Sequence, residues 1–143
     1  MRVIALTLIV SIGCAAATLA PADVRLNEDA CAHCRMTLVS IRTAAQIVAS
    51  GEEPLMFDEL GCLRDYLAAH SLGANARVYV ADHRTGAWVE ASSAVFTRTT
   101  LATPMSSGLI AHADAASRDA DAGTHNGEVV PNAAVLQPPR TTP

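Results

Sequence analysis

Four side chains that bind soft metal ions lie within six residues of this chain. The segment Cys31-Ala-His-Cys-Arg-Met36 contains two thiols, an imidazole and a thioether. Thiolates and thioethers are polarisable donors that favour Cu(I), whereas Mg²⁺ and Ca²⁺ prefer oxygen ligands. The segment therefore predicts a metal site, and Cu(I) is the ion that its donors suit best.

Cys34 and Met36 are the first predicted ligands. In an extended chain, residues two apart project on the same side, about 6.5 Å apart at the backbone, and the flexible methionine side chain can close the remaining distance. The alternative is that Met36 is a core methionine and Cys34 a small apolar residue. The neighbouring Cys31 and His33 favour metal binding, and Cys31 is either a further ligand or a disulfide partner of Cys34.

The Cys-x-x-Cys spacing of Cys31 and Cys34 also occurs in thiol-disulfide oxidoreductases and in zinc sites. An oxidoreductase needs the pair at a helix N-terminus after a strand, where the thiolate pKa falls, but here it precedes a β-branched run. A structural zinc site needs four ligands, and the sequence contains no second paired-ligand motif. Both alternatives stay open, and copper binding is preferred.

Met105 is the candidate for a third soft ligand. A thioether on a loop bounded by Pro104 and Gly108 is an unusual place for core packing. Cys62 lies on the apolar side of an expected helix and is assigned to packing. His112 stands in an apolar strand and is interpreted as a hydrogen-bonded core histidine. The histidines with polar neighbours are expected at the surface: His70, His83 and His125.

The first residues predict export from the cytoplasm. Met1-Arg2 is a minimal positive segment, and residues 3–12 form an uncharged apolar run. The run is too short to cross a bilayer, which takes a helix of about 20 residues. Residues 1–13 are therefore interpreted as a secretory signal peptide.

Cys14 follows small residues in a pattern that resembles the lipobox of bacterial lipoproteins, whose cysteine becomes the lipid-modified first residue. Ser11 departs from the usual leucine, and the alternative is cleavage near residues 15–20, which would give a soluble exported protein. In the preferred interpretation Cys14 is lipidated and residues 14–30 form a tether to the membrane. Ala15, rather than Asp, favours the outer membrane.

Composition limits the remaining function classes. A chain of 143 residues holds one ordinary domain or two very small ones. Half of the residues are apolar but only 3% are aromatic, so the core must be mainly aliphatic. The net charge is -4 and the ten basic residues, all arginines, are not clustered. A nucleic-acid partner is therefore not expected.

The order strand, strand, helix, strand occurs twice, so an α+β fold of two related ββαβ units is expected. For the first unit, 31–82, the patterns predict strands at 36–41, 43–49 and 77–81 and a helix capped by Asp58 that runs to His70 and is ended by Gly73. For the second unit, 87–130, they predict extended segments within 88–97 and 108–112, a helix capped by Asp114 that ends near Gly123, and a strand at 128–130. Residues 131–143, rich in Pro and Thr, are expected to be a disordered tail.

Taken together, these segments resemble the NosL family, the copper-binding lipoproteins that accompany nitrous oxide reductase. The matching pieces are Cys14, the stretch from Cys31 to Met36, Phe57-Asp-Glu-Leu-Gly-Cys62, Val78-Tyr-Val-Ala-Asp82, Trp88-Val-x-Ala-x-x-Ala94 and Thr103-Pro-Met-Ser-Ser-Gly-Leu-Ile-Ala111. They follow the family's order over nearly the whole chain, and that order is far more specific than any one piece.

The resemblance implies two related ββαβ units, a fold also compared with organomercurial lyase. It implies a monomeric Cu(I) chaperone without enzymatic activity, at the periplasmic face of a bacterial membrane. Its expected partners are nitrous oxide reductase, whose copper centres it would supply, and the membrane ABC-type assembly complex. The family's ligands fall on Cys34 and Met36, and the Thr-Pro-Met loop offers Met105.

Two positions depart from the family pattern. The family usually has Gly where Arg35 stands and tends to have Phe where His112 stands. Neither change removes a sulfur donor, but Arg35 adds a bulky cation beside a Cu(I) thiolate. Two alternative functions stay open: a thiol-dependent enzyme of the organomercurial-lyase type, which needs a carboxylate proton donor such as Asp58, and a structural zinc or disulfide lipoprotein.

Overall fold

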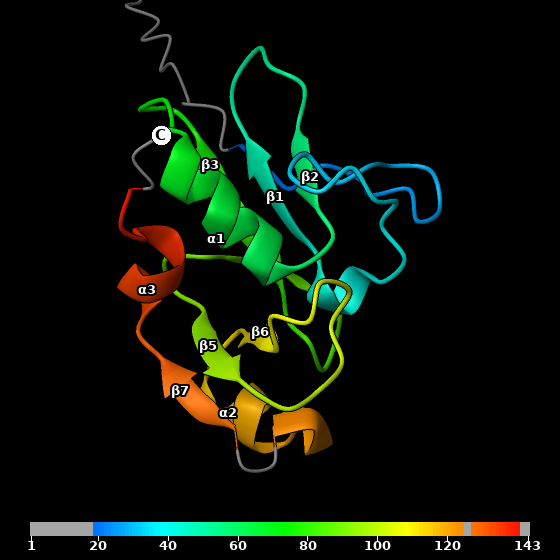
Figure 1. Ribbon diagram of the computed structural model, residues 1–143, viewed down its shortest axis with the longest axis vertical. Helices are drawn as coiled ribbons and strands as arrows, with labels where there is room; N and C mark the ends of the chain where they lie inside the picture. The colour runs from blue at the N-terminus through cyan, green and yellow to red at the C-terminus, as the bar shows by residue number, and fades with distance from the viewer. Residues whose placement is uncertain (1–18, 125–126, 141–143) are drawn as a thin grey trace, which may run out of the picture.

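Two small antiparallel sheets and a few helices make up the computed structural model, which describes residues 19–124 and 127–140 (Figure 1). The first sheet contains β1 (Ala45–Val48), β2 (Leu55–Phe57), β3 (Arg77–Ala81) and β4 (Trp88–Glu90), in the order β2-β1-β3-β4. The second contains β5 (Val95–Arg98), β6 (Leu109–His112) and β7 (Glu128–Val130), in the order β6-β5-β7. The expected α+β class is confirmed.

The two sheets share one topology. In the first, β1 pairs antiparallel with β2 and with β3, the strand that follows helix α1 (Leu60–Ala69). In the second, β5 pairs in the same way with β6 and with β7, which follows helix α2 (Ala115–Asp119). The chain is thus compatible with two ββαβ-like units, although β4, predicted in the second unit, pairs with β3 in the first sheet. A tight turn at residues 82–87 makes β3 and β4 a hairpin, and Gly86 has a positive φ there.

The predicted first helix is confirmed to within one residue at each end, but the capping residues differ from those expected. Glu59 is the N-cap of α1, because the Asp58 carboxylate accepts the backbone N–H of Val39 at 3.4 Å instead. The helix ends at Ala69, before Gly73 is reached. The cap of α2 is confirmed, since Asp114 accepts the backbone N–H of Ser117 at 2.7 Å. After α2 a short 3-10 helix, Ala122–Thr124, follows.

No strand forms over residues 36–41, where the sequence predicted one. Thr37 makes only an isolated bridge with Ala30, and a 3-10 helix covers Ile41–Thr43. The described part of the expected tether, residues 19–30, is bound to the first sheet. The buried Gln46 side chain accepts the N–H of Ala22 at 2.7 Å and donates to its carbonyl at 3.1 Å. This part of the segment is therefore held against the fold.

The expected disordered tail begins with a helix. Helix α3 (Asn132–Leu136) contacts α1, and its Val135 side chain is completely buried. The Asn132 amide donates to the carbonyls of Ser92 at 3.2 Å and Ala94 at 3.1 Å. The prediction was wrong here because Ala-Ala-Val-Leu can bury an apolar face, whereas the Pro and Thr content lies beyond it.

The core lies between α1 and the two sheets and is mainly aliphatic, as the composition predicts. Its fully buried large side chains come from both units and include Leu38, Phe57, Leu63, Val80, Phe96 and Leu109. One phenylalanine comes from each unit. Because α1 contacts β1, β2 and β6, the two units share this core.

The predicted signal peptide and the lipidated Cys14 lie outside the described residues. Within residues 19–124 and 127–140, none of the helices combines the length and the apolar composition that crossing a bilayer requires.

Candidate metal centre

The segment from Cys31 to Met36 forms a closed loop, whereas an extended chain was expected between Cys34 and Met36. The Cys31 N–H donates to the Met36 carbonyl at 2.8 Å, and the Arg35 N–H donates to the Cys31 carbonyl at 3.0 Å. Arg35 has a φ of 66°, which turns the chain between Cys34 and Met36. The argument that these two side chains project on one side of a strand is therefore wrong, although both still belong to one small loop.

The backbone at Arg35 gives a physical reason for the glycine expected there from the family. A left-handed φ costs a residue with a Cβ about 1–2 kcal/mol, and glycine adopts it freely. Arg35→Gly is expected to raise the free energy of unfolding by about 0.5–1 kcal/mol, since the freer unfolded chain offsets part of the gain. Urea denaturation measures this difference. Arg35→Ala is the control, and an equal gain in that variant would assign the effect to the lost charge.

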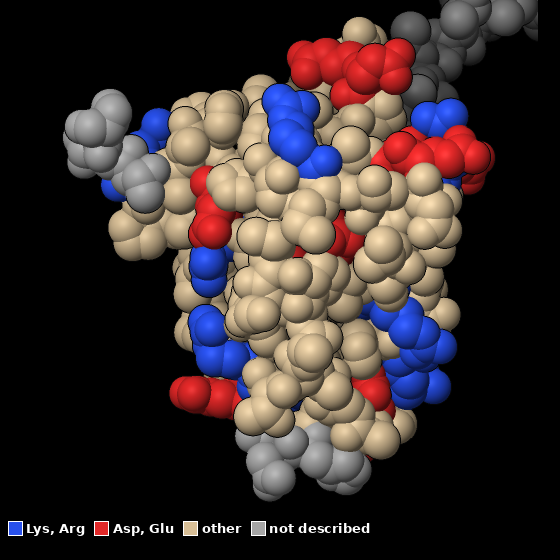
Figure 2. Space-filling view, turned by 45° about the vertical axis from the view of Figure 1, so that its right-hand side comes forward, with Lys and Arg blue, Asp and Glu red and all other residues tan. Residues whose placement is uncertain are grey.

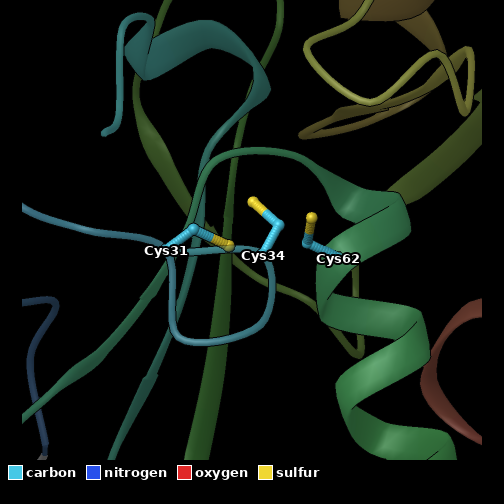
Figure 3. A group of neighbouring side chains, drawn as sticks. All are labelled: Cys31, Cys34 and Cys62. Carbon is cyan, nitrogen blue, oxygen red and sulfur yellow. The ribbon is translucent and has the colours of Figure 1, made fainter. Parts of the chain in front are cut away.

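The thiol of Cys62 lies beside the two thiols of the loop. It lies in the first turn of α1, and Figure 3 shows its side chain beside those of Cys31 and Cys34. All three Sγ atoms lie within 4.8 Å of one another, and all three thiols are free. The assignment of Cys62 to packing alone is therefore corrected: the residue is buried, but its sulfur completes a cluster of three soft donors.

Cys31 is the thiol that the site favours as a thiolate. Its side chain is fully buried, and burial by itself raises the pKa. The backbone N–H groups of Asp58, Cys34 and His33 all donate to its sulfur, as does the Cys34 thiol, and together they hold the pKa below the usual range. Such a ring of backbone donors is a typical way to stabilise an anion.

Cys34 and Cys62 favour the protonated form. Burial raises the pKa of Cys34, and the hydrogen bond that it donates to Cys31 adds to this, despite a backbone N–H donated to its sulfur by Met36. Burial raises the pKa of Cys62 far above its usual range, and the negative charge on Cys31 raises it further. Of the three sulfurs, Cys31 is therefore the one that loses its proton most easily, and a thiolate with two further sulfur donors suits a soft cation.

The NosL family model matches residues 23–137, a range that contains the three clustered cysteines and both ββαβ-like units. The chain belongs to the NosL family. The resemblance found in the sequence is confirmed, and NosL membership indicates a copper-binding accessory role. Comparison with curated proteins and with solved structures gave no match.

The two methionines predicted as ligands of this NosL chain are exposed. Met36 is 50% exposed and Met105 is 48% exposed, so neither is a core methionine. The Met105 loop reaches the cysteines' end of α1, because Ser107 packs directly on Gly61, the residue before Cys62. A Cβ on Gly61 would lie 2.6 Å from the Ser107 Cβ. Both thioethers thus belong to segments beside the cluster, and their role as ligands stays a prediction.

Buried carboxylates lie close to the same end of α1. Burial and the neighbouring Glu59 raise the pKa of Asp58, and its Oδ2 and both Glu59 oxygens have no hydrogen-bond partner. Within the described parts of the chain, however, no carboxylate oxygen or imidazole nitrogen joins the three sulfurs at their mutual 4.8 Å spacing. The donor atoms that converge in this cluster are therefore three sulfurs.

Proposed function

We propose that this protein is a Cu(I) carrier that does no covalent chemistry. The observation that supports it is the convergence of the Cys31, Cys34 and Cys62 sulfurs in a protein of the NosL family. Soft donors of this kind bind Cu(I) strongly. Here they come from a surface loop and one helix turn, an arrangement with fewer ligands than a closed cage.

The position of the cluster suits release as well as binding. Cys34 is only partly buried, and the Met36 side chain beside it is half exposed. A sulfur or nitrogen ligand of a partner can therefore reach the ion from the side of Cys34. The buried Cys31 can still coordinate the ion at that point. Handover by exchange of one ligand at a time needs this accessible side.

The surface beside the cluster combines exposed apolar side chains with the charge of Arg35. Exposed apolar side chains on the segments around it are Met36, Val39 and Met105. Figure 2 shows charges of both signs separated by a broad uncharged area on the face turned forward. Such a surface suits a transient protein partner.

We further propose the setting in which the carrier works. The lipobox-like Cys14 and the preceding apolar run support a lipid anchor on the periplasmic face of a membrane, with the outer membrane favoured. Family membership supports nitrous oxide reductase as the recipient, with the membrane ABC-type assembly complex as the partner. In this setting the chain acts as a monomer and supplies copper for the reductase's copper centres.

The test is a Cu(I) titration of the reduced protein against a chromophoric Cu(I) chelator. We expect one tightly bound equivalent, and X-ray absorption should show sulfur neighbours. Replacing Cys34 by Ser together with Met36 by Leu should weaken binding by at least about 100-fold, since losing even an outer-shell partner costs about 10–100-fold. Met56→Leu, a change of one buried methionine outside the cluster, is the control. Parent affinity in the double variant would refute the assignment of these two ligands.

A further inference from the structure

A second cluster of metal-binding side chains shares no residue with the cysteines. His83 Nδ1 lies 2.6 Å from Asp121 Oδ2, and His112 Nε2 lies 2.9 Å from the same oxygen. The three ligand atoms lie within 4.8 Å of one another. His112 is a buried, hydrogen-bonded core histidine, as predicted, whereas His83 is partly buried and not at the surface as expected.

The three residues come from separate segments that the fold brings together. His83 follows β3, His112 ends β6, and Asp121 lies between α2 and the next 3-10 helix. The backbone N–H of His83 donates to the carbonyl of Ala111 at 2.8 Å. Ala111 directly precedes His112, so this hydrogen bond holds the two histidines close together. The cluster therefore lies where the two ββαβ-like units meet.

The carboxylate of Asp121 contacts both histidines and is fixed in place by a backbone hydrogen bond. Its Oδ1 accepts the Gly123 N–H at 2.8 Å, which leaves Oδ2 to both imidazoles. Burial raises its pKa, but the hydrogen bonds from His112 and His83 bring the pKa down to about 2, so the carboxylate stays charged at neutral pH. A charged, buried carboxylate with two imidazole nitrogens on one oxygen is a donor set that a cation can use.

His112 presents one ring nitrogen to the cluster. The side chain is completely buried, and its Nε2 contacts Asp121, whereas its Nδ1 has no hydrogen-bond partner. An ion bound at Nε2 would leave Nδ1 without a partner as well, so the site rests on the three converging ligand atoms.

We propose that His83, His112 and Asp121 form a binding site for a borderline divalent cation of the first transition row, separate from the cysteine cluster. Imidazole and carboxylate ligands suit Zn²⁺ or Cu²⁺ better than Cu(I). Three protein ligands leave the fourth tetrahedral position to water.

The two contacts to Asp121 need only a small adjustment to hold an ion. Ligand distances of about 2.0–2.1 Å place tetrahedral donor atoms about 3.3 Å apart, so the contacts of 2.6 and 2.9 Å must widen by less than about 1 Å when the ion replaces the protons. His83 can provide that movement, since its side chain is 18% exposed while that of His112 is 0% exposed. Gly123 leaves space for the ring, because a Cβ there would lie 3.1 Å from His83 Cε1.

The test is a titration of the reduced protein with Zn²⁺ after one equivalent of Cu(I) has filled the cysteines. We expect one further equivalent to bind, and zinc X-ray absorption should show nitrogen and oxygen neighbours only. Absence of binding, or sulfur neighbours around the zinc, would overturn the proposal. The copper equivalent is followed separately, so failure of the cysteine site is seen as unbound copper.

Ligand variants make the test specific. His83→Gln and His112→Phe should each weaken zinc binding at least about 30-fold and leave the Cu(I) affinity unchanged. His112→Phe introduces the residue that the resemblance led us to expect at this position, and His83→Gln changes a partly exposed side chain, so the test does not depend on one buried substitution. His70→Gln is the control, because His70 bonds the Tyr66 carbonyl away from the cluster. If His83→Gln bound zinc as tightly as the parent, the proposal would be wrong, and the cluster would be a hydrogen-bonded network only.

Discussion

Cys62→Ser is expected to weaken Cu(I) binding by at least about 100-fold, because losses of outer-shell partners already cost about 10–100-fold. The substitution replaces the sulfur from α1 with a hydroxyl, a hard donor that Cu(I) binds poorly. It leaves Cys31 and Cys34 on their own loop, closed by the Cys31 to Met36 hydrogen bond. Competition with a chromophoric Cu(I) chelator under reducing conditions measures the affinity.

Loss of stability must be separated from loss of the ligand, because Cys62 is buried. Val80→Ala truncates a fully buried side chain outside the cluster and should lower the free energy of unfolding by about 1–3 kcal/mol. It keeps all three sulfurs, so its Cu(I) affinity should match the parent. If Cys62→Ser also bound copper like the parent, the ligands would be those that the sequence alone suggested, from the Cys31 to Met36 loop and Met105.

The features that the sequence predicted correctly depend on local patterns. The β-branched and aromatic residues of Arg77–Ala81 mark β3, and the side chain of Asp114 caps α2 by accepting the N–H of Ser117, three positions away. The Cys31 to Met36 segment is recognisable because its donors are adjacent in the chain. Each of these signals is contained within a few residues, so no knowledge of the packing was needed.

The features that it missed depend on packing between distant segments or on a single backbone angle. Cys62 comes within reach of Cys31 only because α1 starts beside the loop, and no spacing rule joins residues so far apart. The left-handed backbone at Arg35 turns the chain that was expected to be extended between Cys34 and Met36, and an arginine in the sequence does not indicate such a turn. A third cysteine in the segment that opens a helix was the one available hint of the full cluster.

The same distinction applies to the histidines. His83, with polar neighbours, was placed at the surface by its local sequence. Its partial burial follows from the pairing of residue 82 with Ala111, which joins the two units. Asp121 was not singled out at all, because a carboxylate between an alanine and an alanine carries no local signal. Both residues gain their chemical surroundings from the contact between the units.

Asp82→Asn is expected to lower the free energy of unfolding by about 3 kcal/mol, since hydrogen bonds to charged groups contribute about 1.5–3 kcal/mol each. The buried carboxylate accepts four hydrogen bonds. Two come from Thr85, through its N–H at 2.8 Å and its hydroxyl at 2.9 Å. The other two come from the second unit, from the Ala113 N–H at 2.8 Å and the Ser117 hydroxyl at 2.6 Å. An asparagine amide would turn an N–H₂ group toward two of these donors.

Urea denaturation at neutral pH measures the loss. Asp119→Asn removes a carboxylate from an exposed position on α2 and should change the free energy of unfolding by less than about 0.5 kcal/mol. A loss in Asp82→Asn no larger than in this control would contradict the role of Asp82 in joining the units.

The pH dependence gives an independent check on Asp82. Burial raises its pKa, but the four hydrogen bonds lower it more, so the pKa in the folded state lies below the value of about 3.9 in the unfolded chain. A group with a depressed pKa contributes stability that is present above the unfolded-state pKa and lost as the pH falls through the folded-state pKa. The stability of the parent should therefore fall steadily from about pH 5 to pH 2, and Asp121 adds to this loss. Asp82→Asn lacks one of the two carboxylates, so its free energy of unfolding should fall less steeply over the same pH range. If the free energy of unfolding fell equally steeply with pH in the parent and the variant, the pKa of Asp82 would be the same in the folded and unfolded chains.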